Sequence, residues 1–282
     1  MSTHSQGAVR GACGAAHPVL RPASSAVANL VEIFSSAQGE GPHVGRRTLF
    51  VRFGGCDLRC AWCDSPHTWR PAVLCRMETV PGSGVFREIE NPVSTAAVLE
   101  AAEDLDLCEH AVASLTGGEP LLQPEAVAEL AQAVRARGPR VLLETHGLAV
   151  SALESLVSHL DIVSMDWKLR SDVRREGEAR RDSGEDFHDQ HEAFLSVARR
   201  APEVVVKVVV TPNTKDAELD EVCRRVARTA PAAPLILQPV TPTGSVKHAP
   251  APEQLLVWLQ RASRFHTDVR LIPQVHRALG LL

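Results

Sequence analysis

The sequence predicts an α/β fold, a partial or modified (β/α) barrel of about six parallel strands. From residue 30 onward, short apolar segments typical of strands alternate with helical patterns. Such alternation requires a parallel sheet with right-handed crossover connections. No GxGxxG segment follows the first predicted strand, which disfavours the main alternative, a flat doubly wound sheet of the Rossmann type.

The elements follow one another in a regular order. The predicted strands are residues 48–53, 110–116, 140–145, 161–167, 203–211, 234–240 and 268–274. The predicted helices run from an N-capping Ser94 to about Asp106, over 124–137 before Gly138, over 151–159, from about Thr214, and over 251–263. Serine favours the N-cap of a helix, and glycine favours the position after its last turn.

Two segments depart from this alternation. Apolar runs on both sides of VPGSG predict a β-hairpin insert at about residues 70–93. The charged stretch 171–190 predicts a solvated loop or a frayed helix. Residues 1–28 are rich in Ala, Ser and Gly and lack periodicity, which predicts a disordered tail or a translation start placed too early. The core domain is then expected to span residues 29–282.

Composition narrows the class of protein. With 44% hydrophobic and 23% charged residues, the chain has the composition of an ordinary soluble globular protein. A net charge of −4 provides no overall basic field for nucleic acid. The longest apolar runs are too short to span a bilayer, and the N-terminus lacks the apolar segment of a signal peptide. We therefore expect a cytoplasmic protein, in which clustered cysteines more often bind metal than form disulfides.

The segments that follow the predicted strands are polar, glycine-rich or cysteine-bearing. They are GGCDLRCAWC, TGGEP, ETHG, SMDWK, TPN and QPVT. Ordinary turns use the same residue types. However, ligands in such folds bind at the carboxyl ends of the strands, which all meet at one rim. Because polar segments recur at the end of one predicted strand after another, they favour a common ligand site.

Cys56, Cys60 and Cys63 form the most informative motif, with the spacing C-x3-C-x2-C. Thiolates select zinc or iron–sulfur clusters, and structural zinc sites usually have two separated ligand pairs. No second close pair of cysteines exists, although His67 leaves a Cys3His zinc site open. A 4Fe–4S cluster held by three cysteines would instead leave one iron free for a cosubstrate, as catalytic metals keep an open position.

This loop, with Trp62 before its last cysteine, resembles the signature of the radical S-adenosylmethionine (SAM) superfamily. The ordered series EIFSSAQGEG, TLFVRFGGCDLRCAWCDSPHTW, SLTGGEPLLQ, LETHG, VSMDWK, LQPV and IPQVHRALG resembles the 7-carboxy-7-deazaguanine synthase family, from about Leu30 to the C-terminus. The resemblance implies a barrel of the radical SAM type and a carbon–nitrogen lyase of queuosine and 7-deazapurine biosynthesis. In the implied reaction, a reduced cluster cleaves SAM and the 5′-deoxyadenosyl radical abstracts hydrogen from 6-carboxy-5,6,7,8-tetrahydropterin. The ring then contracts with loss of ammonia, and Mg²⁺ assists.

The resemblance also implies roles for individual residues, none of them a catalytic acid or base. The implied metal ligands are Cys56, Cys60 and Cys63 for the cluster and Ser65 for Mg²⁺. The implied SAM-binding residues are Trp62, Asp64, Gly118, Glu119, Glu144, Thr145, Ser164, Lys168 and Gln238. The implied substrate-binding residues are Gln38, Gly39, Glu40, Arg52, Thr116 and the C-terminal Leu282. Their chemistry is suitable: a guanidinium binds a carboxylate bidentately, amide and carboxylate groups match a pterin edge, and glycine permits close approach of the backbone.

One segment departs from the family pattern, because SMDWK stands where many relatives have SPK, and Asp166 and Lys168 could form a simple ion pair instead. The family further implies an electron donor such as flavodoxin or ferredoxin, and a homodimer. Two other functions stay open. A radical SAM activase would act on a partner protein and would not need QGEG, Arg52 or Ser65. A non-enzymatic zinc module would use the three clustered cysteines and His67.

Overall fold

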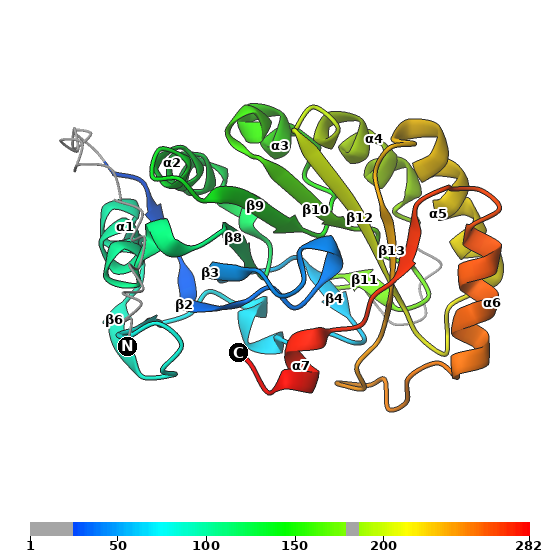
Figure 1. Ribbon diagram of the computed structural model, residues 1–282, viewed down its shortest axis with the longest axis horizontal. Helices are drawn as coiled ribbons and strands as arrows, with labels where there is room; N and C mark the ends of the chain where they lie inside the picture. The colour runs from blue at the N-terminus through cyan, green and yellow to red at the C-terminus, as the bar shows by residue number, and fades with distance from the viewer. Residues whose placement is uncertain (1–24, 179–185) are drawn as a thin grey trace, which may run out of the picture.

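The computed structural model describes residues 25–178 and 186–282, which form one ten-stranded sheet with the order β14-β13-β12-β10-β9-β8-β3-β2-β5-β6 (Figure 1). Seven consecutive strands are mutually parallel: β3 (Arg47–Phe53), β8 (Val112–Gly117), β9 (Arg140–Thr145), β10 (Ile162–Asp166), β12 (Glu203–Val210), β13 (Leu235–Pro239) and β14 (Val269–Leu271). The sheet ends at β14 and β6 and does not close. The predicted partial barrel is therefore confirmed, with seven parallel strands.

Helices cover the outer side of the curved sheet (Figure 1). They are α1 (Thr95–Asp104), α2 (Pro124–Arg135), α3 (Val150–Leu156), α4 (His188–Ala198), α5 (Asp216–Thr229) and α6 (Pro252–Ala262), and the short α7 (Val275–Leu279) lies near the C-terminus. As predicted, the Ser94 side chain caps α1 by accepting a hydrogen bond from the Ala97 N–H at 3.2 Å. The sequence analysis missed α4 and α7. The first turn of α4 lies in the charged stretch, where its apolar spacing was not visible.

The N-terminal part of the sheet extends beyond the prediction. Strand β2 (Leu30–Ala37) was not predicted and pairs antiparallel with β3. The hairpin insert forms β5 (Leu74–Glu78) and β6 (Phe86–Glu90), and β5 pairs with β2. The insert therefore lengthens the sheet at one edge.

Residues 25–28 correct the predicted tail, because they belong to the folded structure. Strand β1 (Val27–Ala28) pairs with β7 (Val93–Ser94), and Ala28 is fully buried. The Ala26 N–H donates to the Glu129 carboxylate at 2.9 Å. Residues 1–24, the rest of the predicted tail, lie outside the described residues.

The charged stretch 171–190 also differs from the prediction of a loop or frayed helix. It contains β11 (Val173–Arg175), which pairs antiparallel with β4 (Leu58–Cys60) in the cysteine loop. The pairing is stabilised because Val173 and Leu58 are buried together in a small apolar cluster. Residues 179–185 of the stretch lie outside the described part of the chain.

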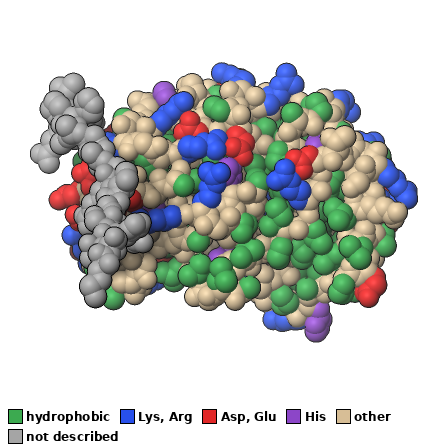
Figure 2. Space-filling model, in the orientation of Figure 1, with side chains coloured by type: hydrophobic (Ala, Val, Ile, Leu, Met, Phe, Trp, Pro, Cys, Tyr) green, Lys and Arg blue, Asp and Glu red, His purple; other side chains and the backbone are tan. Residues whose placement is uncertain are grey.

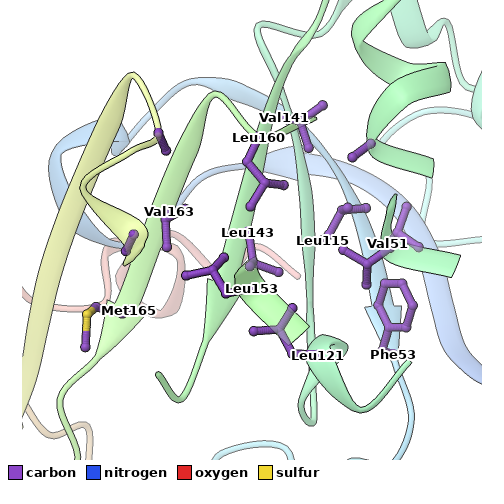
Figure 3. Close-up of a cluster of buried hydrophobic side chains, with 14 of the residues drawn as sticks. Val51, Phe53, Leu115, Leu121, Val141, Leu143, Leu153, Leu160, Val163 and Met165 are labelled. Carbon is purple, nitrogen blue, oxygen red and sulfur yellow. The ribbon is translucent and has the colours of Figure 1, made fainter. Parts of the chain in front are cut away.

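Side chains of the parallel strands face alternately the apolar core and the inner side of the sheet. Val141 and Leu143 of β9, and Val163 and Met165 of β10, point into the apolar core between sheet and helices (Figure 3). Successive strand residues face opposite sides of a sheet. The intervening residues therefore face the inner side of the curved sheet. Among residues 25–178 and 186–282, no helix is long and apolar enough to cross a membrane.

Candidate active site

The inner faces of the central strands line one cavity. They contribute Thr116 from β8, Glu144 from β9, Ser164 and Asp166 from β10, Lys207 from β12 and Gln238 from β13. The cysteine loop, the QGEG turn and the C-terminal residue complete the wall. Every predicted site residue except Glu119 lines this cavity.

The three cysteines of the loop are free thiols, half-buried, and face the cavity together. Further backbone hydrogen bonds fix the loop in addition to the β4–β11 pairing. The Ala61 N–H donates to the Asp172 carbonyl at 2.8 Å, and the Cys63 N–H donates to the Cys60 carbonyl at 3.2 Å. The loop is therefore anchored by main-chain bonds, which leaves its thiols available to a ligand.

Gly118 allows the loop after β8 to pack directly on the cysteine loop. A Cβ atom at this position would lie 2.1 Å from the Gly55 carbonyl oxygen and 2.9 Å from that of Thr68. The next residue, Glu119, donates its N–H to the same Gly55 carbonyl at 2.8 Å. The GGE segment thus holds the residue before Cys56 in place.

Glu119 lies beneath the cavity, which does not support its predicted contact with SAM. Its side chain is fully buried. It accepts hydrogen bonds from the Leu121 N–H at 3.0 Å, the Thr145 hydroxyl at 2.8 Å and the His146 N–H at 2.8 Å. Its carboxylate therefore joins the loops after β8 and β9. His146 extends this support to the cysteine loop, because its Nε2 lies 2.8 Å from a carboxylate oxygen of Asp57.

The QGEG turn is held by protein contacts on both sides. Gln38 donates through Nε2 to Glu144 at 2.8 Å and accepts from the N–H groups of Gly39 and Glu40. Glu144 also accepts from the Thr116 hydroxyl at 3.3 Å, so it lies with the predicted substrate residues although it was predicted to bind SAM. A Cβ atom on Gly39 would lie 2.0 Å from Nδ1 of His276. This glycine lines the cavity and also allows close contact with the C-terminal segment.

A group of potential cation ligands lies beside this turn. Ligand atoms of Glu40, Asp64 and His276 are all within 4.8 Å of one another. The Ser65 hydroxyl donates to Asp64 at 3.1 Å, and the Gln274 amide donates to Glu40 at 2.8 Å and to Asp64 at 2.9 Å. Carboxylate and hydroxyl oxygens suit Mg²⁺, so this group and Ser65 are the candidate site for that ion.

Arg52 and Gln238 both present polar atoms to the cavity. Arg52 donates through Nε to Glu32 at 2.9 Å, which orients the guanidinium over the Phe34 ring at 5.7 Å. No hydrogen bond of the two terminal guanidinium nitrogens is found within the described ranges. Gln238 is 3% exposed, and its Oε1 atom has no partner among the described residues. A buried polar atom normally has a partner, so this oxygen indicates a ligand with a donor.

Sequence comparison supports the family resemblance. The family model of the radical SAM superfamily matches residues 50–226. The chain is 39% identical over 261 residues to the 7-carboxy-7-deazaguanine synthase of Geobacter sulfurreducens, covering 90% of this chain and 98% of that protein. It is 35% identical over 264 residues to the synthase of Methanothermobacter thermautotrophicus, with coverages of 90% and 98%. The chain belongs to the 7-carboxy-7-deazaguanine synthase family of the radical SAM superfamily.

Solved structures agree with this family at the level of the fold. QueE from Escherichia coli superimposes with a TM-score of 0.55 at 18% identity, covering 89% of this chain and 95% of that chain. The enzyme anSMEcpe, solved with AdoMet and a peptide, superimposes with a TM-score of 0.51 at 16% identity, with coverages of 83% and 67%. At these identities the likeness concerns the fold alone.

The donor set fits the iron–sulfur cluster that the family uses. Burial raises the pKa of Cys60 to about 12 and that of Cys56 to about 11. Each thiolate therefore requires a bound cation, and the iron of a cluster supplies that charge. The Cys3His zinc alternative fits less well, because His67 is exposed and does not line the cavity.

The sequence analysis assigned no role to Lys207, although it interrupts the apolar run EVVVKVVV of β12. A lysine in a buried strand was the available signal, because such a side chain needs a charged partner. Gln274 was also missed, and His276 was recognised only as part of the closing PQVH segment. Both follow β14, at the end of the chain, where the segment packs back on the QGEG turn: the Val275 N–H donates to the Gly39 carbonyl at 2.8 Å.

His191 supports the site from behind and predicts a pH dependence. The ring is fully buried and stacks on Trp167 at 5.1 Å. Backbone groups surround the ring: Nε2 lies 3.1 Å from the Lys168 nitrogen and 3.0 Å from the His146 carbonyl oxygen, and Nδ1 lies 2.8 Å from the Phe187 carbonyl oxygen. Burial lowers the pKa of His191 to about 3.

Because the unfolded chain binds this proton near pH 6.5 and the folded protein does not, stability is expected to fall as the pH drops below 6.5. The loss through this group is about 1.4 kcal/mol per pH unit down to its folded pKa. His191→Gln should flatten the dependence of the melting temperature on pH between 6.5 and 4.5, whereas His67→Gln, at an exposed position, should not. Equal slopes in wild type and His191→Gln would contradict the assigned neutral state.

Proposed function

We propose that this protein is a 7-carboxy-7-deazaguanine synthase that converts 6-carboxy-5,6,7,8-tetrahydropterin to 7-carboxy-7-deazaguanine with loss of ammonia. One observation carries the proposal: three free cysteines, Arg52 and the Glu40 carboxylate face the same cavity. A candidate cluster site and a polar recognition surface are thus adjacent. Family membership at 39% identity over most of the chain supports the same reaction.

The chain supplies binding and orientation, as proteins commonly do when a cofactor carries the difficult chemistry. The bound cluster and SAM would supply the radical that starts the reaction. Arg52 would bind the substrate carboxylate through the guanidinium nitrogens that Glu32 leaves free. Glu40, held by Gln274, would accept the N–H groups of the pterin edge. Leu282 also lines the cavity and would lie close to the substrate.

The cofactor side lies around the cysteine loop and the ends of β9, β10 and β13. Trp62, Gly118, Thr145, Ser164, Lys168 and Gln238 would contact SAM. The unpartnered Gln238 oxygen would accept a donor of the cosubstrate. Mg²⁺ would bind at Ser65 beside Asp64, Glu40 and His276, because the oxygens of Ser65, Asp64, Glu40 and the substrate carboxylate suit this ion.

The remaining partners follow from the same reaction. Reduction of the cluster requires an electron donor such as flavodoxin or ferredoxin in the cytoplasm. Apolar side chains gather on the lower part of the face shown in Figure 2. Leu256, Val257, Leu279 and Leu281 are among the exposed large apolar residues. Such surfaces often mark protein contacts, which supports a homodimer.

An anaerobic turnover assay tests the proposed function. The protein is reconstituted with iron and sulfide, reduced, and supplied with SAM, Mg²⁺ and 6-carboxytetrahydropterin, and mass spectrometry follows the products. We expect 7-carboxy-7-deazaguanine that depends on cluster and SAM. Formation of 5′-deoxyadenosine without this product would retain the superfamily chemistry and refute the substrate.

Arg52→Ala is expected to raise the KM for carboxypterin about 10- to 100-fold, because a hydrogen bond to a charged group contributes about 1.5–3 kcal/mol. Cleavage of SAM without substrate should change little. Arg76→Ala is the matched control, since Arg76 pairs with the same Glu32 at 3.5 Å but does not line the cavity. Equal losses in both activities for Arg52→Ala would indicate a structural role for Arg52.

A further inference from the structure

Lys207 is a buried cation that joins two carboxylates. Its strand neighbours Val206 and Val208 face the core, so alternation turns Lys207 toward the cavity. The ammonium lies 3.1 Å from Asp166 Oδ1 and also contacts the Glu40 carboxylate. Burial opposes the charged form, but Asp166 and Glu40 outweigh it and hold the pKa of Lys207 above its ordinary value. The side chain is therefore charged at any working pH.

These contacts belong to a row of four alternating charges: Glu40, Lys207, Asp166 and Lys168. Lys168 Nζ lies 2.7 Å from the second oxygen of Asp166 and 4.6 Å from the centre of the Trp62 ring. The row thus begins in the QGEG turn and ends above the cysteine loop. The sequence analysis left open a simple ion pair between Asp166 and Lys168. This pair exists, but Asp166 also contacts Lys207, so the pair is part of a larger row.

We propose that Lys207 couples the two ends of the cavity, so that cosubstrate bound beside Lys168 strengthens the binding of substrate at Glu40. The proposal rests on the proposed function, which places SAM at the cysteine end and the pterin at the QGEG end. Nothing in the family resemblance assigned a role to Lys207. It acts here as a positioning residue, through Glu40 and Asp166.

The direction of the coupling follows because Lys168 and Lys207 both neutralise Asp166. An anionic group of SAM bound beside Lys168 would take up part of the positive charge of Lys168 that neutralises Asp166. Asp166 then depends more strongly on Lys207, and the attraction of Lys207 for Glu40 weakens. Glu40 is left freer to accept N–H donors from the pterin. Lys168 and Lys207 are buried, and charges interact more strongly in a buried environment than in water. By linkage, the substrate strengthens SAM binding by the same factor.

Calorimetric titration of the reconstituted enzyme tests the coupling. The cluster is kept oxidised so that no turnover occurs, and 6-carboxytetrahydropterin is titrated with and without SAM. We expect SAM to lower the substrate Kd of the wild type about fivefold or more, within the usual range of coupling between sites. Lys207→Met and Asp166→Asn should bring the ratio of the two Kd values close to one. Lys207→Arg, which keeps the charge, should retain a ratio above that of Lys207→Met.

Val209→Ala is the matched control, because Val209 lies on the same face of β12 two residues further on and also lines the cavity. It should retain the wild-type ratio. A wild-type ratio in Lys207→Met, or no effect of SAM in the wild type, would overturn the coupling. If Lys207→Met does not load its cluster, the ratio in Asp166→Asn decides. SAM binding without pterin binding in every protein would refute the proposed substrate and, with it, this coupling.

Discussion

Cys60→Ala is expected to abolish cluster binding and cleavage of SAM. The thiol of Cys60 lies between Cys56 and Cys63 in the loop, and burial raises its pKa to about 12. A thiol whose pKa is raised this far stays protonated at neutral pH unless a metal binds it. With two thiolates remaining, the cluster loses one of its three protein ligands, and reconstituted protein should contain little iron and sulfide. The absorbance of the cluster and the release of 5′-deoxyadenosine give the measurement.

Cys223→Ala provides the control for this result. Cys223 is a free cysteine of α5, fully buried in the core and absent from the cavity. Its substitution removes one buried sulfur, as Cys60→Ala does, but should leave cluster content unchanged. Full iron content and wild-type cleavage of SAM in Cys60→Ala would refute the ligand assignment.

Gly118→Ala is expected to produce the second large effect, through the backbone. The added Cβ atom would approach the Gly55 carbonyl oxygen to 2.1 Å, and this carbonyl also accepts the Glu119 N–H. A main-chain atom so fixed cannot rotate away, so the loop after β8 and the cysteine loop must separate. Overpacking of this kind typically costs about 1–3 kcal/mol, and the melting temperature should fall by several degrees. Cluster content should fall as well, because Gly55 precedes Cys56.

Gly39→Ala is the control that tests whether the effect of Gly118→Ala comes from its clash with a main-chain carbonyl or would follow replacement of any glycine in the site. The three atoms nearest to its Cβ atom would all belong to the His276 side chain in the short C-terminal helix α7, which can shift as a unit more easily than the loops of the sheet. We expect a smaller loss of melting temperature, and we expect His276→Gly, which also removes the Cβ atom at 2.6 Å, to relieve it in the double variant. A Gly118→Ala protein with wild-type melting temperature and iron content would show that the two loops can relax apart.

The seven parallel strands and their rim were predictable because the signals are local. Each strand is a short apolar run, and the order strand–helix–strand determines which ends meet. The cysteine spacing is equally local, since three thiols within eight residues define a ligand set before any folding is considered. Strand β2 was missed because its residues LVEIFSSA do not alternate clearly. Helix α4 was missed because it begins among charged residues.

The partners of the site residues could not be predicted in the same way. Glu119 and Glu144 were both recognised, but only the packing of the loops after β8 and β9 shows that one is fully enclosed by protein donors and the other holds Gln38. Gly39 was recognised for the freedom of its backbone. The structure shows instead that His276, from the other end of the chain, occupies the space beside it.

By itself, the sequence determined the type of fold, the three candidate cluster ligands and the rim on which the site lies, because these depend on spacing along the chain. Tertiary structure alone decided the row of charges through Lys207, whose partner Glu40 is 167 positions away. Period-two alternation turns Lys207 away from the core, but it does not say which carboxylate faces it across the cavity. That depends on how the QGEG turn and the C-terminal segment pack over the open side of the sheet.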